Sequence, residues 1–150
     1  LNYRSKKGWK LYLVVLSWLC LTVAVPLASA DNFIFVLFFK LIILQGIYIF
    51  VAILPFEIGD LNSDQLNLQT LPQRLGVFKV KQIGLILLAL GILFASINFY
   101  NFSSLALSTL VTFLILGIML WRSNENQSSY FARFWVEGIP ILWYFMTYYF

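Results

Sequence analysis

Five long apolar runs, separated by shorter polar segments, dominate the pattern of this sequence. Each run has about the 20 residues that a helix needs to cross roughly 30 Å of hydrocarbon. Backbone groups cannot stay unpaired in lipid, and the runs lack the strict alternation of barrel strands, so helices are predicted. The expected spans are about 11–29, 33–54, 82–99, 105–121 and 134–150. The predicted fold class is therefore an all-α, polytopic membrane helical bundle with about five transmembrane helices.

The connections between these runs differ in length and charge. Two are short turns, at about 30–32 and 100–104, whereas 55–81 and 122–133 are longer and polar. Five spans in series place those two loops and the amino-terminal segment on one side. These three segments carry nine of the ten Lys and Arg residues: Arg4, Lys6, Lys7, Lys10, Arg74, Lys79, Lys81, Arg122 and Arg133. Such a bias marks the cytoplasmic side. We expect an integral protein of a bacterial inner (cytoplasmic) membrane, with these three segments in the cytoplasm.

Composition supports lipid as the solvent and excludes several functions. Hydrophobic residues make up 61% of the chain and charged residues 11%, against about 45–50% and about 25% in soluble domains. The net charge of +4 comes from residues at the ends of apolar runs, so nucleic acid is not an expected partner. With one cysteine and no histidine, a disulfide framework, a thiolate metal site and a histidine base are excluded within this sequence. Cys20 is interpreted as a small packed hydrophobe.

A few residues inside the runs break the apolar pattern. Lys40 lies within the second run, where a charge is a functional-site candidate, but snorkelling or pairing with a neighbour is the preferred interpretation. Gly84 and Gly91, seven residues apart in the third run, predict close helix packing. Glu137 and Pro140 open the last run, where an acid favours a helix amino terminus and Pro is tolerated. The Trp and Tyr residues crowded into that run are interpreted as an interfacial belt.

Three of the six acidic residues fall in one short window at the start of the 55–81 loop. Glu57, Asp60 and Asp64 are spaced so that on a helix their side chains share one face. Like charges at this spacing repel, and the intervening sequence contains no cation to offset them. Mg²⁺ takes oxygen ligands, one or two carboxylates together with substrate phosphates. Two interpretations stay open at this point: a magnesium–diphosphate site and a solvated acidic loop.

The segment from Pro55 to Gly76 resembles the second aspartate-rich motif of the UbiA-type intramembrane prenyltransferases. In many bacterial relatives that region reads roughly D-x-R-D-x-x-x-D, followed after a short stretch by T-L-P-x-x-L-G. This sequence has E-I-G-D-L-N-S-D at 57–64 and T-L-P-Q-R-L-G at 70–76. The start at Gly8-Trp9-Lys10 resembles the family's entry to its fifth helix. The resemblance implies a single membrane domain over 1–150, the carboxy-terminal half of a nine-helix protein.

The resemblance also implies roles for individual residues. Asp60 and Asp64 correspond to the metal-binding pair of the second motif, and Glu57 stands where relatives have a preceding Asp. Arg74, with Lys79 in the same loop, is expected to contact the diphosphate of the substrate.

The function that the resemblance implies is Mg²⁺-dependent transfer of a prenyl group from a polyprenyl diphosphate to a small acceptor, often an aromatic ring. Such chemistry needs no nucleophilic side chain, since the metal charge promotes departure of the diphosphate. One position departs from the pattern, because Gly59 replaces the Arg that relatives often carry. This departure favours the alternative, a non-catalytic membrane subunit of the same fold that binds lipid, quinone or a membrane protein partner.

Overall fold

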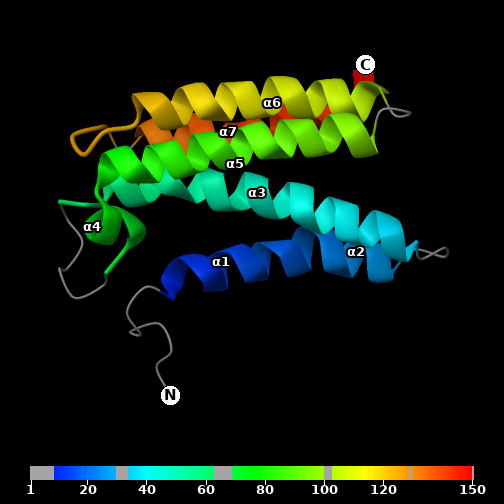
Figure 1. Cartoon of the computed structure of the whole chain (residues 1–150), viewed down its shortest axis with the longest axis horizontal. Coiled ribbons are helices and arrows are strands. Elements are labelled where there is room, and N and C mark those ends of the chain that lie inside the picture. Colours follow the sequence, from blue (N-terminus) through cyan, green and yellow to red (C-terminus); the bar gives the residue numbers. More distant parts are fainter. Residues whose placement is uncertain (1–8, 30–33, 63–68, 100–102, 129, 150) are drawn as a thin grey trace.

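The computed structural model describes residues 9–29, 34–62, 69–99, 103–128 and 130–149. Within these ranges the chain is helical with short turns and contains no strand. Four helical stretches are long and apolar enough to cross a membrane: Lys10–Ala28, Phe35–Gly59, Val77–Asn98 and Ser104–Arg122. They run side by side along the long axis of the molecule (Figure 1). The predicted all-α membrane bundle is therefore confirmed for the described part of the chain.

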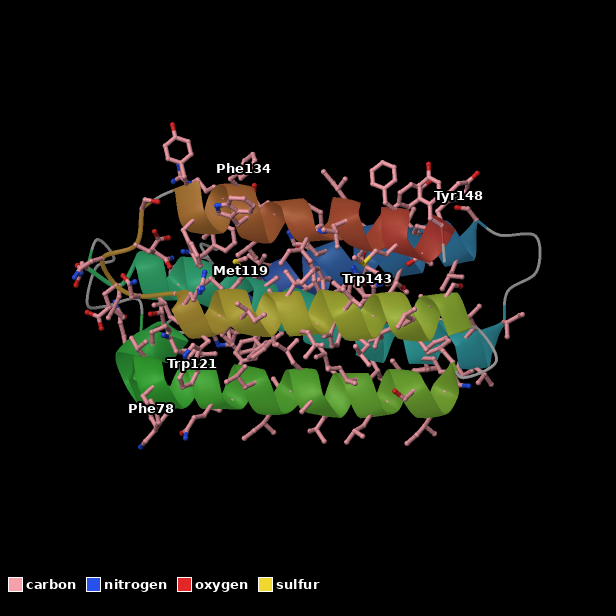
Figure 2. All side chains as sticks on the ribbon, turned by 90° about the horizontal axis from the view of Figure 1, so that it is seen from above. Phe78, Met119, Trp121, Phe134, Trp143 and Tyr148 are labelled. Carbon is pink, nitrogen blue, oxygen red and sulfur yellow. The ribbon has the colours of Figure 1, made fainter. Side chains whose placement is uncertain are left out.

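The outer surface of these helices is apolar, as expected where lipid is the solvent. Along α5 (Val77–Asn98), exposed aliphatic side chains recur every three or four residues, at Ile86, Leu90, Leu93 and Ile97. Figure 2 shows Phe78, Phe134 and Tyr148 pointing away from the bundle, and all three are exposed. A water-soluble monomer rarely presents apolar surface on this scale. The protein is thus built for a membrane.

The first membrane helix consists of three consecutive segments, α1 (Lys10–Leu19), the π-helical η2 (Cys20–Ala24) and α2 (Val25–Ala28). Pro26 has no N–H to donate, which removes one hydrogen bond of the regular helical ladder just after the π-helical turn. Thr22 Oγ1 donates to the carbonyl of Trp18 at 2.8 Å, so its hydroxyl is satisfied within the helix. Cys20, which the sequence predicts to be a small packed hydrophobe, is exposed on the surface of the bundle.

The second helix, α3 (Phe35–Gly59), extends past the predicted end at 54 and contains Pro55. Near its beginning, Lys40 is half-buried and places Nζ 5.9 Å from the centroid of the Phe99 ring. That distance is within the range of a cation–π interaction. The interpretation that Lys40 pairs with a neighbour is therefore confirmed.

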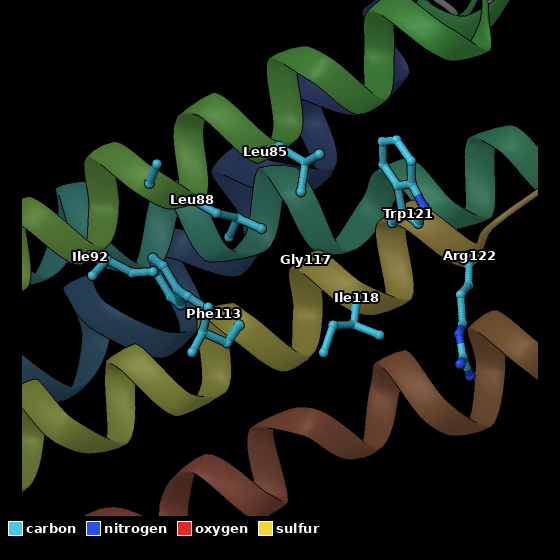
Figure 3. A pocket seen from close by; sticks show the side chains of 10 residues that line it. Leu85, Leu88, Ile92, Phe113, Gly117, Ile118, Trp121 and Arg122 are labelled. Carbon is cyan, nitrogen blue, oxygen red and sulfur yellow. The ribbon is translucent and has the colours of Figure 1, made fainter.

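The contact between α5 and α6 (Ser103–Arg122) depends on glycine. A Cβ at Gly91 would lie 2.5 Å from Cε2 of Phe113, and one at Gly84 would overlap Leu120. The predicted close packing at Gly84 and Gly91 is confirmed. Gly117 of α6 differs, because a Cβ there would meet Leu85 and Leu88 at an ordinary 3.5 Å; Figure 3 shows both leucines on the side of α5 that faces α6.

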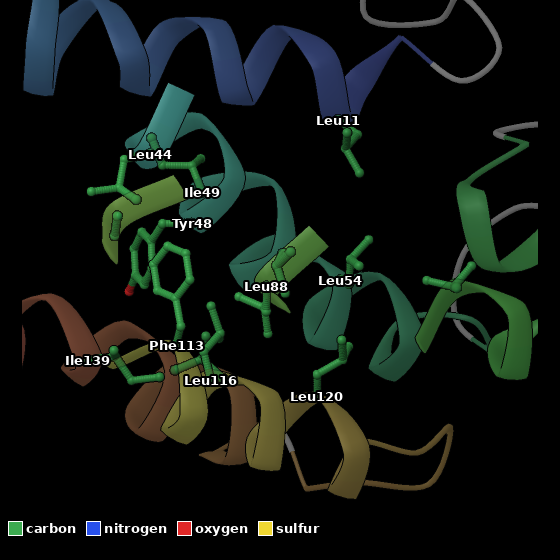
Figure 4. Close-up of a cluster of buried hydrophobic side chains, with 14 of the residues drawn as sticks. Leu11, Leu44, Tyr48, Ile49, Leu54, Leu88, Phe113, Leu116, Leu120 and Ile139 are labelled. Atoms are coloured by element: carbon green, nitrogen blue, oxygen red, sulfur yellow. The ribbon is translucent and has the colours of Figure 1, made fainter. Parts of the chain in front are cut away.

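The core lies where α3 meets α5 and α6 (Figure 4). Its fully buried side chains include Val51, Leu54, Leu116 and Leu120. Because α3 contacts α1, α5 and α6, it is the central helix of the bundle. Burial of these four aliphatic side chains takes a large apolar area out of contact with lipid. The shapes of the side chains determine which helices pack against α3.

The carboxy-terminal segment forms the π-helical η4 (Phe131–Val136) followed by α7 (Glu137–Tyr149). Glu137 begins α7, but η4 continues directly into it, so Glu137 lies within one continuous helical stretch and the predicted role at a helix amino terminus is wrong. This segment packs along α6 (Figure 2), but it is not among the four helices that meet the length and hydropathy of a membrane span. The fifth predicted span is thus a helix of the bundle, with a weaker membrane signature than the others.

The ends of the bundle agree with the predicted arrangement of loops. The start of α1, the short helix α4 (Leu71–Leu75) and the segment 123–128 all lie at one end of the bundle, and the carboxyl terminus lies at the other (Figure 1). Lys10, Arg74, Lys79, Lys81 and Arg122 therefore belong to one end. The described part of the chain thus supports the predicted common side of these segments.

Candidate functional site

The acidic window predicted from the sequence lies where α3 ends. Glu57, in the last turn of α3, is only 5% exposed, whereas Asp60 forms the C-cap of the helix and is exposed. The chain then turns through residues 60–62, so the helical face predicted for the three carboxylates ends at Asp60. Asp64 lies outside the described residues. The structure thus brings Glu57 and Asp60 together at one end of the bundle, one carboxylate buried and one accessible.

The second block of the motif folds as a separate short helix. Thr70 and Gln73 form a capping box at the start of α4, in which the Thr70 N–H donates to Gln73 Oε1 at 3.1 Å. Gly76 follows with φ +81°, a conformation that suits glycine, and α5 begins at the next residue. Because α4 packs against α3 and α5, the second block lies beside the acidic end of α3.

The two predicted diphosphate-binding cations are accessible at this same end. Arg74 is exposed in the last turn of α4, and Lys79 is exposed in the first turns of α5. No ion pair of either side chain with a carboxylate of the described residues is found. Among those residues, His, Cys, Asp and Glu form no group of three or more that could hold a metal. Of the predicted site residues, two carboxylates, Glu57 and Asp60, and two cations, Arg74 and Lys79, therefore lie at this end within the described chain.

Position 59, where the family pattern has Arg, is covered by the segment that follows α6. Gln127 Nε2 donates to the carbonyl oxygen of Pro55 at 2.6 Å, and Gln127 Oε1 accepts from the backbone N–H of Asn124 at 3.2 Å. A Cβ at Gly59 would lie 2.5 Å from Gln127 Nε2. The absence of a side chain at Gly59 therefore lets Gln127 cap the end of α3. No local pattern in the sequence predicts this contact, since its partners are 72 positions apart.

A second feature is a cavity of about 440 Å³ in the half of the bundle away from α4. Elements η2, α2, α3, α6 and α7 contribute to its walls, which are mostly aliphatic and aromatic. Trp143 lies at its edge and packs against Tyr48 and Phe113, with ring centroids 5.1 and 5.8 Å away. Trp143 is thus half-buried against the hydrophobic core, a contact that the interpretation of the aromatics as an interfacial belt does not include.

The cavity contains few polar groups, and these are neutral. Thr147 Oγ1 donates to the carbonyl of Trp143 and lies 2.9 Å from Ser108 Oγ on α6. Gln45 is half-buried and forms no hydrogen bond within the described residues. A polar side chain in the middle of an apolar span is costly and signals function, so Gln45 could have been recognised from the sequence. The cavity is suited to an uncharged, largely apolar ligand.

The cavity and the buried carboxylate lie on different faces of α3. At about 100° per residue, the 12 positions between Gln45 and Glu57 turn the helix by roughly 120° beyond whole turns. A ligand in the cavity would therefore place a polar group near Gln45 and Thr147, and not near Glu57. Two separate candidate sites result: an acidic site at one end of α3 and an apolar cavity toward the other.

No family model matches the chain, and no curated protein and no solved structure is significantly similar to it. The resemblance to UbiA-type proteins therefore stays a prediction from the two sequence blocks.

Proposed function

We propose that this chain is part of a Mg²⁺-dependent polyprenyl transferase of the UbiA type. The diphosphate of the prenyl donor binds at the end of α3. One observation carries the proposal: the two sequence blocks that resemble the family motif fold beside each other. The first ends α3 with Glu57 and Asp60, and the second forms α4, which packs against α3. Two exposed cations, Arg74 and Lys79, lie at the same end.

The side chains at this end match the ligands that Mg²⁺ prefers. Glu57 and Asp60 offer only carboxylate oxygens, and Mg²⁺ is usually held by one or two carboxylates together with substrate phosphates. When bound, the ion neutralises charge on the departing diphosphate. Arg74 can contact phosphate oxygens through two parallel N–H groups, which fixes the orientation of the donor. Lys79 adds a positive charge at the membrane surface that attracts the anionic donor.

Binding of a non-hydrolysable polyprenyl diphosphate analogue tests the proposal. The protein is titrated in detergent micelles with and without Mg²⁺, as wild type and as the Asp60→Ala, Asp64→Ala double variant. Glu125→Ala is the matched control, because Glu125 is an exposed carboxylate of the segment that follows α6. Binding that needs Mg²⁺ and is lost only in the double variant supports the proposal. Equal binding by all three proteins, independent of the metal, refutes it.

A second candidate is the non-catalytic subunit, which binds a quinone or another neutral lipid in the cavity. Two observations favour it. Gln127 covers position 59, where a diphosphate-binding Arg is expected in an active relative. The cavity has neutral polar groups, and its position on α3 is turned away from Glu57.

A quinone titration separates the two candidates. Gln45→Leu removes the amide from the cavity wall with little change in volume, and Gln82→Leu is the control because Gln82 is exposed on α5. The second candidate requires that quinone binding be weakened by Gln45→Leu and not by Gln82→Leu. Binding that neither variant affects refutes a role of the cavity.

A further inference from the structure

A groove lies on the outer surface of the bundle between α5 and α6, apart from both candidate sites. It encloses about 380 Å³, and its walls are apolar (Figure 3). Leu85, Ala89 and Ile92 of α5 form one wall, and Leu114 and Ile118 of α6 form the other. Because Leu114 and Ile118 are exposed, the groove is open to the surrounding lipid.

One glycine, Gly117, lies in the lining of the groove. Gly84 and Gly91 are in close contact with Leu120 and Phe113 of α6, so the two helices touch on the buried side. Gly117 is buried, and a Cβ there would meet Leu85 and Leu88 of α5 at 3.5 Å, an ordinary contact. Because Gly117 has no side chain of its own, the floor of the groove stays low at this position, where a larger side chain would rise into it.

One end of the groove is positively charged. Trp121 and Arg122, the last residues of α6, line it there, and both are exposed. Lys81 Nζ donates to the carbonyl of Trp121 at 2.8 Å, which places a second cation nearby. Neither cation forms an ion pair with a carboxylate of the described residues. The groove thus ends at an exposed guanidinium and an exposed indole on consecutive residues of α6, the residue types found at membrane–water interfaces.

We propose that this groove binds one acyl chain of an anionic phospholipid whose phosphate contacts Arg122. The apolar walls match the chain, and the guanidinium matches the phosphate oxygens in charge and in hydrogen-bond geometry. A zwitterionic lipid would gain less binding free energy from Arg122, because its headgroup carries a compensating cation. A transmembrane helix of another protein seated in the groove would supply no anion for Arg122. The proposal is independent of the transferase assignment, since the groove shares no residue with the acidic site or the cavity.

Native mass spectrometry of the intact protein measures the affinity of the first bound lipid. The probes are phosphatidylglycerol and phosphatidylcholine with the same acyl chains. One cation near an anionic lipid is worth about 1 kcal/mol, so Arg122→Gln should weaken phosphatidylglycerol binding about fivefold and weaken phosphatidylcholine binding by a smaller factor. Arg133→Gln is the matched control, an exposed cation of η4 outside the groove lining. It should leave both affinities unchanged.

A second variant tests the apolar part of the groove. Gly117→Leu places a large side chain in the floor of the groove and should abolish the tight binding of the first lipid for both headgroups, whereas Gly138→Leu, at a glycine with no atom within 4 Å of a Cβ, should not. Equal affinities of wild type for the two lipids overturn the proposal. The same applies if Arg122→Gln and Arg133→Gln weaken binding equally, since the effect is then general surface charge. A dimer that excludes lipid and dissociates in Gly117→Leu would also overturn it, in favour of a second copy of the chain.

Discussion

The contrast between Gly91 and Gly117 gives the sharpest test of the packing. In Gly91→Ala, the new Cβ would lie 2.5 Å from Phe113 Cε2 and 3.3 Å from Ile47 Cγ2, whereas unstrained carbon atoms stay about 3.5–4.0 Å apart. The ring of Phe113 has little room to move, because it is buried and packs against Trp143. Either the ring or the α5–α6 spacing must shift by about 1 Å.

Overpacking of this kind costs about 1–3 kcal/mol. Ala also has a better helix propensity than Gly, by up to about 1 kcal/mol, and this gain opposes the loss. In Gly117→Ala the Cβ would meet its neighbours at 3.5 Å, an ordinary contact, so only the propensity gain remains. The propensity effect cancels when the two variants are compared. We therefore expect Gly91→Ala to be less stable than Gly117→Ala by about 1–3 kcal/mol.

The assay is unfolding by sodium dodecyl sulfate in mixed micelles, followed by far-ultraviolet circular dichroism and fitted for the free energy of unfolding. The Phe113→Leu substitution supplies an internal control. In that background the ring is gone, and Gly91→Ala should cost much less. Equal stabilities of the two alanine variants would refute the packing argument. So would a Gly91→Ala penalty that persists unchanged after Phe113→Leu.

Three further contacts can be tested in the same assay. Gln127→Ala removes the hydrogen bond to the end of α3 and should cost about 1 kcal/mol, with faster amide exchange in the last turn of α3; unchanged exchange would contradict this role. A double-mutant cycle of Ser108→Ala and Thr147→Val should give a coupling of about 0.6 kcal/mol for the hydrogen bond between α6 and α7, and zero coupling would argue against it. Lys81→Met removes the donor to the last turn of α6 and should destabilise by about 1 kcal/mol, whereas Lys79→Met, at an exposed neighbour without that bond, should be neutral.

The sequence predicts the membrane helices well because their signal is local. A run of about 20 apolar residues has one stable solution in lipid, so the bundle follows from hydropathy alone. The close contacts at Gly84 and Gly91 were also predictable, because small residues seven positions apart fall on one helix face. Both inferences need only neighbours in the same helix.

Features that depend on distant segments do not follow from the local sequence. Hydropathy ends the second span at 54, before Pro55, whereas α3 continues to Gly59 and its end is capped by Gln127. Hydropathy also groups Trp143 with the interfacial aromatics, whereas its half-buried ring packs against Tyr48 and Phe113. In each case the deciding partner is supplied by another helix or loop, and hydropathy along one segment contains no information about it.

The hydrogen bond between Gln127 and Pro55 also has a consequence for biogenesis. A chain leaves the ribosome at about 5–20 residues per second, so Gln127 is synthesised on the order of several seconds after Pro55, 72 positions earlier. During that interval the Pro55 carbonyl lacks its Gln127 partner. The end of α3 near Gly59 is therefore completed only after α5 and α6 have been synthesised. A translocon or chaperone that handles this protein meets the acidic window before its cover is in place.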